Sequence, residues 1–117
     1  MLKKGKKMID LKQLQKEVYQ NKLDKGFNVT DINKEFCLTY GEMAEAYESW
    51  RKKKDDLGEE FADVVIYLLG LSEILGIDLE NELISKINKN KYREYKIIDN
   101  VNTRTKEYKD NTNEEMQ

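Results

Sequence analysis

The chain of 117 residues carries 21 Lys and Arg residues against 23 Asp and Glu residues, so its formal net charge is −2, which excludes a global electrostatic case for nucleic-acid binding. One cysteine and no histidine exclude an intramolecular disulfide, a zinc site and a His-based nucleophile. No apolar run reaches the ~20 residues of a membrane span, and the basic segment 1–9 lacks the apolar core of a signal peptide. We therefore expect a cytoplasmic, single-domain protein whose chemistry uses carboxylates, Lys, Arg, Asn, Tyr and a metal.

The first predicted helix covers about residues 11–24. Leu11, Leu14 and Val18 recur at helical spacing. Asp10 is suited to the N-cap, and Gly26 follows at the position where helices often end.

A second helix is predicted over about residues 31–53, with Thr30 and Asp31 at its start. Its apolar side chains recur at steps of three and four and are expected to form a core stripe: Ile32, Phe36, Tyr40, Met43, Tyr47 and Trp50. A neighbouring face holds Glu35, Leu38, Glu42, Glu45 and Ser49, so its acidic residues border the buried side. The basic run 51–54 either serves as a solvated cap at the helix end or lets one lysine reach a substrate phosphate.

The third helix is predicted over about residues 58–75, ended by Gly76, and the fourth over about 79–93, capped by Asp78. Residues 64–71 are apolar round nearly the whole helix, which indicates a buried element. On the fourth helix, Lys86, Asn90 and Arg93 offer donors suited to an anionic ligand; the alternative is that the cations only complement the helix dipole.

Polar composition predicts a mobile tail over residues 97–117. Since no strand-like alternation is found, residues 10–96 are expected to form one all-α domain of four helices, resembling a four-helix bundle. Four short helices offer little core and the third is apolar on many sides, which favours a homodimer or homotetramer.

Two acidic pairs, Glu42-x-x-Glu45 and Glu60-x-x-Asp63, carry the main chemical signal. Residues three apart on a helix lie about 5–6 Å from each other, so two facing antiparallel helices would gather four carboxylates. Such a group calls for a hard divalent cation with oxygen ligands, Mg²⁺ first and Mn²⁺ as the alternative. The competing interpretation is that each pair is only a solvated helix face.

The motifs, in their order, resemble the MazG-like nucleoside triphosphate pyrophosphohydrolases of the all-α NTP pyrophosphatase superfamily. The resemblance covers about residues 30–95, includes the fourteen residues between Glu45 and Glu60, and is carried by residues 41–46, 59–68 and 76–79 and by Lys86-x-x-x-Asn90-x-x-Arg93.

The resemblance implies a MazG-type helical fold completed by oligomerisation, and Mg²⁺-dependent hydrolysis of a (deoxy)nucleoside triphosphate to its monophosphate and pyrophosphate. By position, the metal ligands and catalytic carboxylates would be Glu42, Glu45, Glu60 and Asp63. Lys86 and Asn90 would meet phosphate or metal, with Arg93 assisting.

One position departs from the family pattern: many members have a glutamate where this chain has Gly41. This puts a second or third metal position in doubt, for which Glu35 or Glu59 would substitute. Two alternatives follow: a nucleotide-binding or sensing module without catalysis, and a structural protein that docks a partner through Tyr47, Trp50 and the third helix.

Three points stay open in the sequence. Either Glu42 or Glu45 would act as general base, and water would attack either the α or the β phosphorus. Phe27, Tyr40, Trp50 and Tyr92 would either stack on a nucleobase or belong to the core or an interface.

Overall fold

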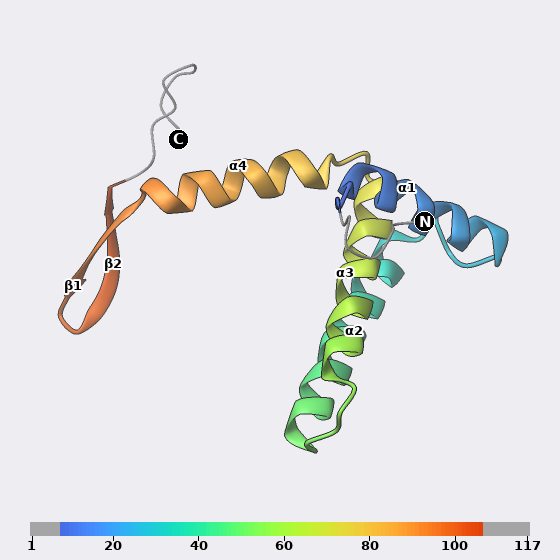
Figure 1. Ribbon diagram of the computed structural model, residues 1–117, viewed down its shortest axis with the longest axis horizontal. Helices are drawn as coiled ribbons and strands as arrows, with labels where there is room; N and C mark the ends of the chain where they lie inside the picture. The colour runs from blue at the N-terminus through green and yellow to red at the C-terminus, as the bar shows by residue number, and fades with distance from the viewer. Residues whose placement is uncertain (1–7, 107–117) are drawn as a thin grey trace. The chain divides into compact units, whose positions relative to one another are not determined.

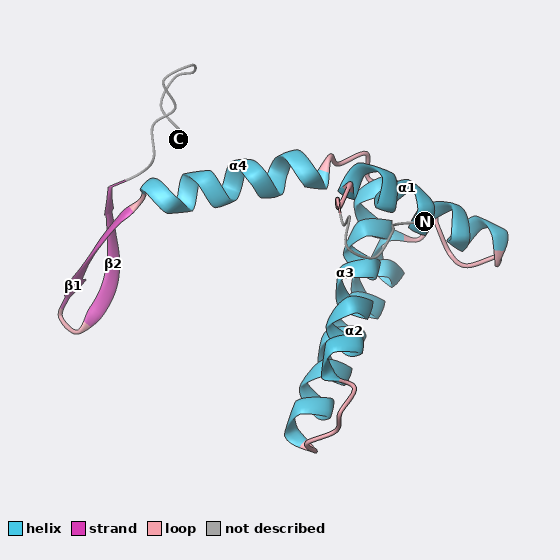
Figure 2. Ribbon diagram, viewed as in Figure 1, coloured by secondary structure: helices cyan, strands magenta, loops and turns pink. Residues whose placement is uncertain are grey.

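The computed structural model describes residues 8–106, which form four helices and a β-hairpin (Figure 1, Figure 2). In chain order the elements are α1 (Leu11–Asp24), α2 (Ile32–Arg51), α3 (Leu57–Ile74), α4 (Leu79–Tyr92), β1 (Glu94–Ile98) and β2 (Val101–Lys106). The described residues fall into two compact units, divided between Leu79 and Glu80. None of the helices within residues 8–106 has the length and apolar character that a bilayer crossing requires.

The four helices begin and end within two residues of the predicted positions, because local signals fix these ends. The Asp10 side chain accepts a hydrogen bond from the Gln13 backbone N–H at 3.0 Å, and Asp31 accepts one from the Lys34 backbone N–H at 3.1 Å. These N-caps satisfy backbone donors that have no partner within the helix.

Three helices end in the same hydrogen-bonded turn, with a left-handed residue just after the last helical turn. Gly26 (φ 70°) follows α1 and Gly76 (φ 69°) follows α3, and glycine takes this conformation at little cost. At the end of α2 the left-handed residue is Lys53 (φ 55°), and the Lys54 backbone N–H donates to the Ser49 carbonyl at 2.9 Å. A lysine therefore occupies a position that favours glycine.

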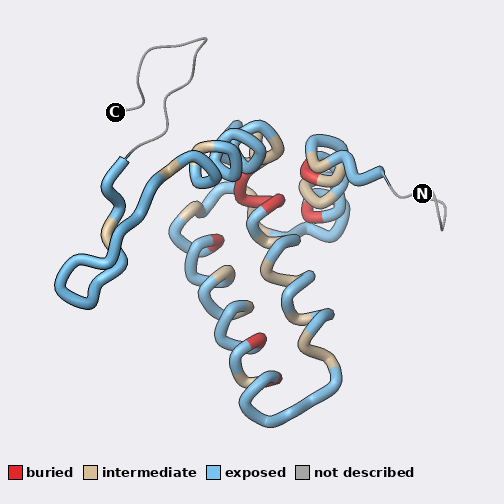
Figure 3. Tube along the Cα trace, turned by 60° about the vertical axis from the view of Figure 1, so that its left-hand side comes forward, coloured by how far each residue is buried: buried red, intermediate tan, exposed pale blue. Residues whose placement is uncertain are grey.

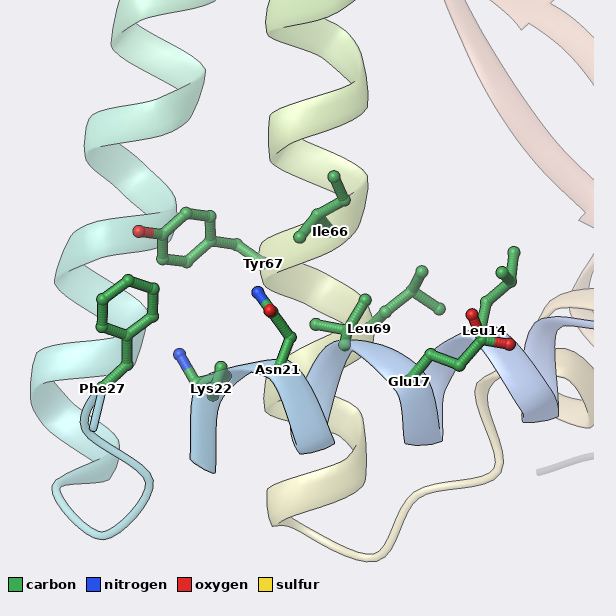
Figure 4. Close-up of a pocket in the computed structure, with 9 residues that line it drawn as sticks. Leu14, Glu17, Asn21, Lys22, Phe27, Ile66, Tyr67 and Leu69 are labelled. Atoms are coloured by element: carbon green, nitrogen blue, oxygen red, sulfur yellow. The ribbon is translucent and has the colours of Figure 1, made fainter. Parts of the chain in front are cut away.

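In the first unit, α2 and α3 run antiparallel and side by side, and α1 lies across the pair near the start of α2 and the end of α3 (Figure 1, Figure 4). Helix α3 packs against both other helices. Gly70 on α3 allows the close approach of α1, because a Cβ atom there would lie 3.3 Å from both Val18 Cγ1 and Lys22 Cδ.

The interior of this unit is more polar than its pattern predicted. The buried apolar side chains among the described residues are Ala46, Leu69 and Leu71; the buried polar ones are Gln15, Lys22, Glu35, Ser49 and Ser72 (Figure 3). Helix α2 thus turns inward the face that carries Glu35, Ala46 and Ser49.

The predicted core stripe of α2 is wrong as a description of this unit. Ile32 is half-buried, whereas the other five members are 42–68% exposed; we name these five the outer stripe: Phe36, Tyr40, Met43, Tyr47 and Trp50. The physical reason is that α3 contacts the neighbouring face of α2, and no described element of the first unit covers the outer stripe.

The expectation of a buried third helix holds at one end only. Residues 69–72 are buried, whereas Val65, Ile66 and Leu68 are exposed. Because α1 crosses α3 near its C-terminal end, it covers that end and leaves the earlier turns open.

The expectation that the chain contains no strands is wrong over residues 94–106. Strands β1 and β2 pair antiparallel, with Ile98 opposite Val101. Between them, Asp99 (φ 51°) and Asn100 (φ 64°) both have positive φ, as a two-residue type I′ hairpin turn requires. Residues 97–106 of the predicted mobile tail therefore belong mainly to this hairpin, and residues 107–117 lie outside the described part of the chain.

Candidate functional site

The two acidic pairs lie on the adjacent helices of the first unit, Glu42 and Glu45 on α2, and Glu60 and Asp63 on α3. We name these four residues the acidic cluster. Glu45 is exposed and the other three are half-buried. The antiparallel course of the helices brings the pairs close enough for the charges of Glu45, Asp63 and Glu60 all to act on Glu42.

Glu42 is the most perturbed group of the acidic cluster. A side-chain hydrogen bond with Glu45 is the largest cause, followed by partial burial and by repulsion from the other carboxylates, and together they raise the pKa of Glu42 to about 7. Two neighbouring carboxylates favour one shared proton over two charges. Glu42 is therefore the carboxyl group of the acidic cluster that most readily keeps a proton near neutral pH.

The negative field extends along α3. Partial burial is the first cause that raises the pKa of Glu60, followed by the charges of Asp56 and Glu45. Burial also comes first in raising the pKa of Tyr67, followed by the charge of Glu42. The α2–α3 contact thus concentrates negative charge in a partly desolvated space.

The acidic cluster does not form a closed set of metal ligands. Within residues 8–106, no three Asp, Glu or Cys side chains are gathered as a metal site requires, although the four carboxylates interact electrostatically. These findings are compatible because charges repel over a longer distance than that at which carboxylates ligate one ion. The donor set, four carboxylates with mutual repulsion, fits the chemistry of a hard divalent cation.

A side-chain contact fastens the turn that leads from α2 to α3. The buried Ser49 hydroxyl donates a hydrogen bond to Asp56 Oδ1 at 2.5 Å. Because this bond joins the end of α2 to the N-cap of α3, it helps to hold the two acidic pairs in register.

Two residues of the basic run at the end of α2 form ion pairs with a carboxylate of the same helix. Arg51 and Lys52 form ion pairs with Glu48 at 2.9 Å and 3.2 Å. Hydrogen bonding to Arg51 is the main cause that lowers the pKa of Glu48. Arg51 and Lys52 are therefore engaged with a carboxylate of their own helix end.

A buried ion pair beside the acidic cluster was not foreseen from the sequence. Lys22 Nζ lies 2.6 Å from Glu35 Oε1 and 5.5 Å from the centre of the Tyr67 ring. The Asn28 side-chain amide donates to Glu35 Oε2 at 2.9 Å. Glu35 is therefore engaged with Lys22 and Asn28, which counts against its role as a substitute metal ligand. No periodic signal links Lys22 on α1 with Glu35 on α2, and only the fold brings them together.

A pocket of about 400 Å³ opens between α1 and α3, within the range of small-molecule sites. It is lined by Leu14, Glu17, Val18, Asn21, Lys22, Phe27, Ile66, Tyr67 and Leu69 (Figure 4). Figure 4 shows Tyr67 reaching from α3 toward α2. Tyr67 lies one turn after Asp63 on α3, and none of the four residues of the acidic cluster lines this pocket.

The predicted anion-binding residues belong to the second unit. Lys86 and Asn90 are exposed on α4, and Asn90 Oδ1 accepts a hydrogen bond from Arg93 Nη1 at 2.9 Å. The structure thus brings Asn90 and Arg93 together. Both lie in the second unit, whereas the acidic cluster lies in the first.

The four aromatic residues considered for base stacking lie in different surroundings. Phe27 lines the pocket, and Tyr40 and Trp50 belong to the outer stripe. Tyr92 ends α4, with Lys91 Nζ 5.6 Å from the centre of its ring. Phe27 is therefore the one of the four that borders the pocket.

Comparisons with models of known protein families, with curated proteins and with solved structures return no match.

Proposed function

We propose that this chain is a Mg²⁺-dependent nucleoside triphosphate pyrophosphohydrolase of the MazG-like class, acting in the cytoplasm, with a helical core completed by self-association. One observation carries the proposal: four carboxylates from two adjacent helices interact in a partly buried space, one turn along α3 from residues that line a pocket of small-molecule size. Such a combination of perturbed carboxylates and an adjoining pocket is typical of catalytic sites.

The residues that would hold the ion are Glu42, Glu45, Glu60 and Asp63. When bound, Mg²⁺ supplies the neutralisation of phosphate oxygens that triphosphate hydrolysis needs. Mn²⁺ has the same preference for oxygen ligands and would substitute.

The other residues divide the remaining tasks. The pocket would receive the nucleoside, with Phe27 and Tyr67 offering aromatic faces to a base. Lys86 and Asn90 would meet the phosphates, with Arg93 orienting Asn90 through the hydrogen bond between them. Whichever of Glu42 and Glu45 does not bind the ion would take the proton from the attacking water as general base.

The decisive assay follows pyrophosphate release from a panel of ribonucleoside and deoxyribonucleoside triphosphates with Mg²⁺ or Mn²⁺. Turnover of at least one nucleotide is expected. We expect Glu60→Gln and Asp63→Ala each to lower turnover on the order of 100-fold or more, as loss of an electrostatic group at a reacting phosphate does. Asp24→Asn, which changes an exposed carboxylate at the end of α1 outside the acidic cluster, is the control.

Circular dichroism of each variant separates loss of chemistry from loss of fold. A folded wild-type chain that releases no pyrophosphate from any nucleotide would defeat the proposal. If hydrolysis occurs in isotopically labelled water, label in the monophosphate indicates attack at the α phosphorus, and label in the pyrophosphate indicates attack at the β phosphorus.

A nucleotide-binding or sensing module is the second candidate. It is favoured by Gly41, which lacks a carboxylate, and by the engagement of Glu35 with Lys22, because both reduce the acidic groups left for additional metal ions. Calorimetric binding of a nucleoside triphosphate without release of pyrophosphate would select this function.

A further inference from the structure

Two lysines of the basic run at the end of α2 have no task in the proposed function. Arg51 and Lys52 pair with Glu48, whereas the amino groups of Lys53 and Lys54 form no ion pair with any residue in the described part of the chain. Both side chains are exposed. The turn between α2 and α3 therefore presents two cations that are available to an anionic ligand.

Lys53 occupies a backbone conformation that does not favour a lysine. Its φ of 55° lies in the left-handed region, which glycine adopts at little cost and other L-residues avoid. Gly26 and Gly76 fill the equivalent positions after α1 and α3. Residues held in such conformations are often found at functional sites. What lysine adds here, compared with glycine, is a positive charge.

Along α3, this turn and the pocket lie on opposite sides of the acidic cluster. Asp56, at the end of the turn, precedes Glu60 by one helical turn, about 6 Å, and its charge acts on Glu60. At the other end, Tyr67 of the pocket follows Asp63 by one helical turn. Figure 1 shows the turn at one end of the α2–α3 pair and α1 crossing near the other end. The order along α3 is therefore turn, acidic cluster, pocket.

The pocket also approaches the acidic cluster along α2. A second pocket of about 280 Å³ shares Lys22, Phe27 and Tyr67 with the one in Figure 4, so the two pockets adjoin. Leu38 lines this second pocket and lies one helical turn before Glu42 on α2. On both helices, the space open to a ligand therefore comes within one helical turn of the acidic cluster.

We propose that Lys53 and Lys54 bind the terminal phosphates of the nucleoside triphosphate, which lies along α2 and α3 with its nucleoside toward α1. This inference rests on the proposed function and assigns the orientation of its substrate. The groups of a nucleoside triphosphate follow one another in the same order as the pocket, the acidic cluster and the two lysines. A lysine ammonium on its flexible stem suits a phosphate at an exposed turn. The two lysines would also hold the pyrophosphate before its release, because it contains the terminal phosphates.

The competing interpretation is that both lysines only complement the dipole at the C-terminal end of α2. The two interpretations differ at Lys53→Gly. Because glycine fits this backbone conformation, a role in phosphate binding predicts a variant that is at least as stable as the wild type but binds phosphate more weakly. A role limited to the dipole predicts no change in phosphate binding.

Calorimetry of the full chain with inorganic tripolyphosphate and Mg²⁺ measures phosphate binding without a nucleoside. We expect Lys53→Gly and Lys54→Ala each to weaken this binding about tenfold, since each removes one charge-assisted contact. Lys54→Arg keeps the charge and should bind nearly as the wild type does. Lys16→Ala, which removes an exposed lysine of α1 that has no ion pair among the described residues, is the control.

A nucleoside monophosphate gives the second comparison, because it lacks the terminal phosphates. Its affinity should be the same in Lys53→Gly, Lys54→Ala and the wild type. In the pyrophosphate-release assay, we expect each variant to raise KM about tenfold and to change kcat less than about twofold, as loss of an interaction made equally in the ground state and the transition state does.

Equal affinity of the wild type and both variants for tripolyphosphate would overturn the inference, as would an equal loss of affinity in Lys16→Ala. A wild-type chain that does not bind tripolyphosphate would overturn it too. The proposed function is judged separately, by turnover. If the chain releases pyrophosphate with an unchanged KM in both variants, only the orientation is wrong. If tripolyphosphate binding depends on the two lysines and no nucleotide is hydrolysed, the lysine site stands and the catalytic function does not.

Discussion

At the scale of the residue, the buried contact between Lys22 and Glu35 shows how the fold limits the candidate site. It joins α1 to α2 at 2.6 Å, and Lys22 also lies over the Tyr67 ring. Such a pair contributes little net stability compared with apolar residues of similar size, but loss of one partner leaves the other charge buried.

We expect Lys22→Met to lower the free energy of unfolding by about 3–5 kcal/mol, because the buried Glu35 carboxyl group would lose its cationic partner. The double change Lys22→Met with Glu35→Met should recover most of this loss. Urea denaturation of both variants and the wild type measures the difference. If Lys22→Met were as stable as the wild type, the prediction that Glu35 depends on Lys22 would be wrong.

The perturbed pKa of Glu42 predicts an unusual pH dependence of stability. It stands at about 7 in the folded chain against an ordinary value of 4.5. Between these values the folded chain holds a proton that the unfolded chain has released. This contribution to stability is therefore complete below pH 4.5 and is lost as the pH rises through 7.

Melting temperatures measured across this range in the presence of a chelator test the prediction. The wild type should lose more stability than Glu42→Gln as the pH rises, whereas Asp24→Asn, at an exposed carboxylate outside the acidic cluster, should follow the wild type. Added Mg²⁺ should stabilise the wild type most above pH 7, where the cluster is ionised. Parallel curves for the wild type and Glu42→Gln would contradict the perturbed pKa.

At the scale of the element, the backbone at the end of α2 is strained at one residue, and a substitution there can relieve the strain. Lys53 has φ 55°, where an L-residue costs about 1–2 kcal/mol relative to the right-handed conformation. Lys53→Gly should therefore raise the free energy of unfolding by up to about 1 kcal/mol, since the greater freedom of glycine in the unfolded chain offsets part of the gain. Thermal denaturation measures it, and Lys52→Gly, at a residue with φ −88°, should give no gain.

At the scale of the whole molecule, the proposed function assigns a task to each compact unit. The acidic cluster lies in the first unit, and Lys86 and Asn90 lie in the second. Lys86→Ala and Asn90→Ala should each lower turnover on the order of 100-fold while the stabilisation by Mg²⁺ remains, because the cluster is intact. Lys89→Ala on the same helix is the control. Full activity in both variants would mean that α4 does not meet the substrate.

The sequence alone determined the four helices and their ends, since caps such as Asp10 and Gly26 act through backbone groups a few residues away. It also placed each acidic pair on one side of a helix, because spacing fixes that locally. The hairpin also has a local cause, because Asp99 and Asn100 form the type I′ turn that joins β1 to β2. The prediction from the sequence did not include this turn.

Tertiary structure decided which face of α2 turns inward. Residues on both of its faces fit helical spacing, and only the contact with α3 selects the polar face, which buries Glu35 and leaves Trp50 exposed. Likewise, only the crossing of α1 over α3 joins Lys22 to Glu35 and forms the pocket beside Tyr67. Such contacts link residues far apart in the chain, so no local pattern in the sequence contains them.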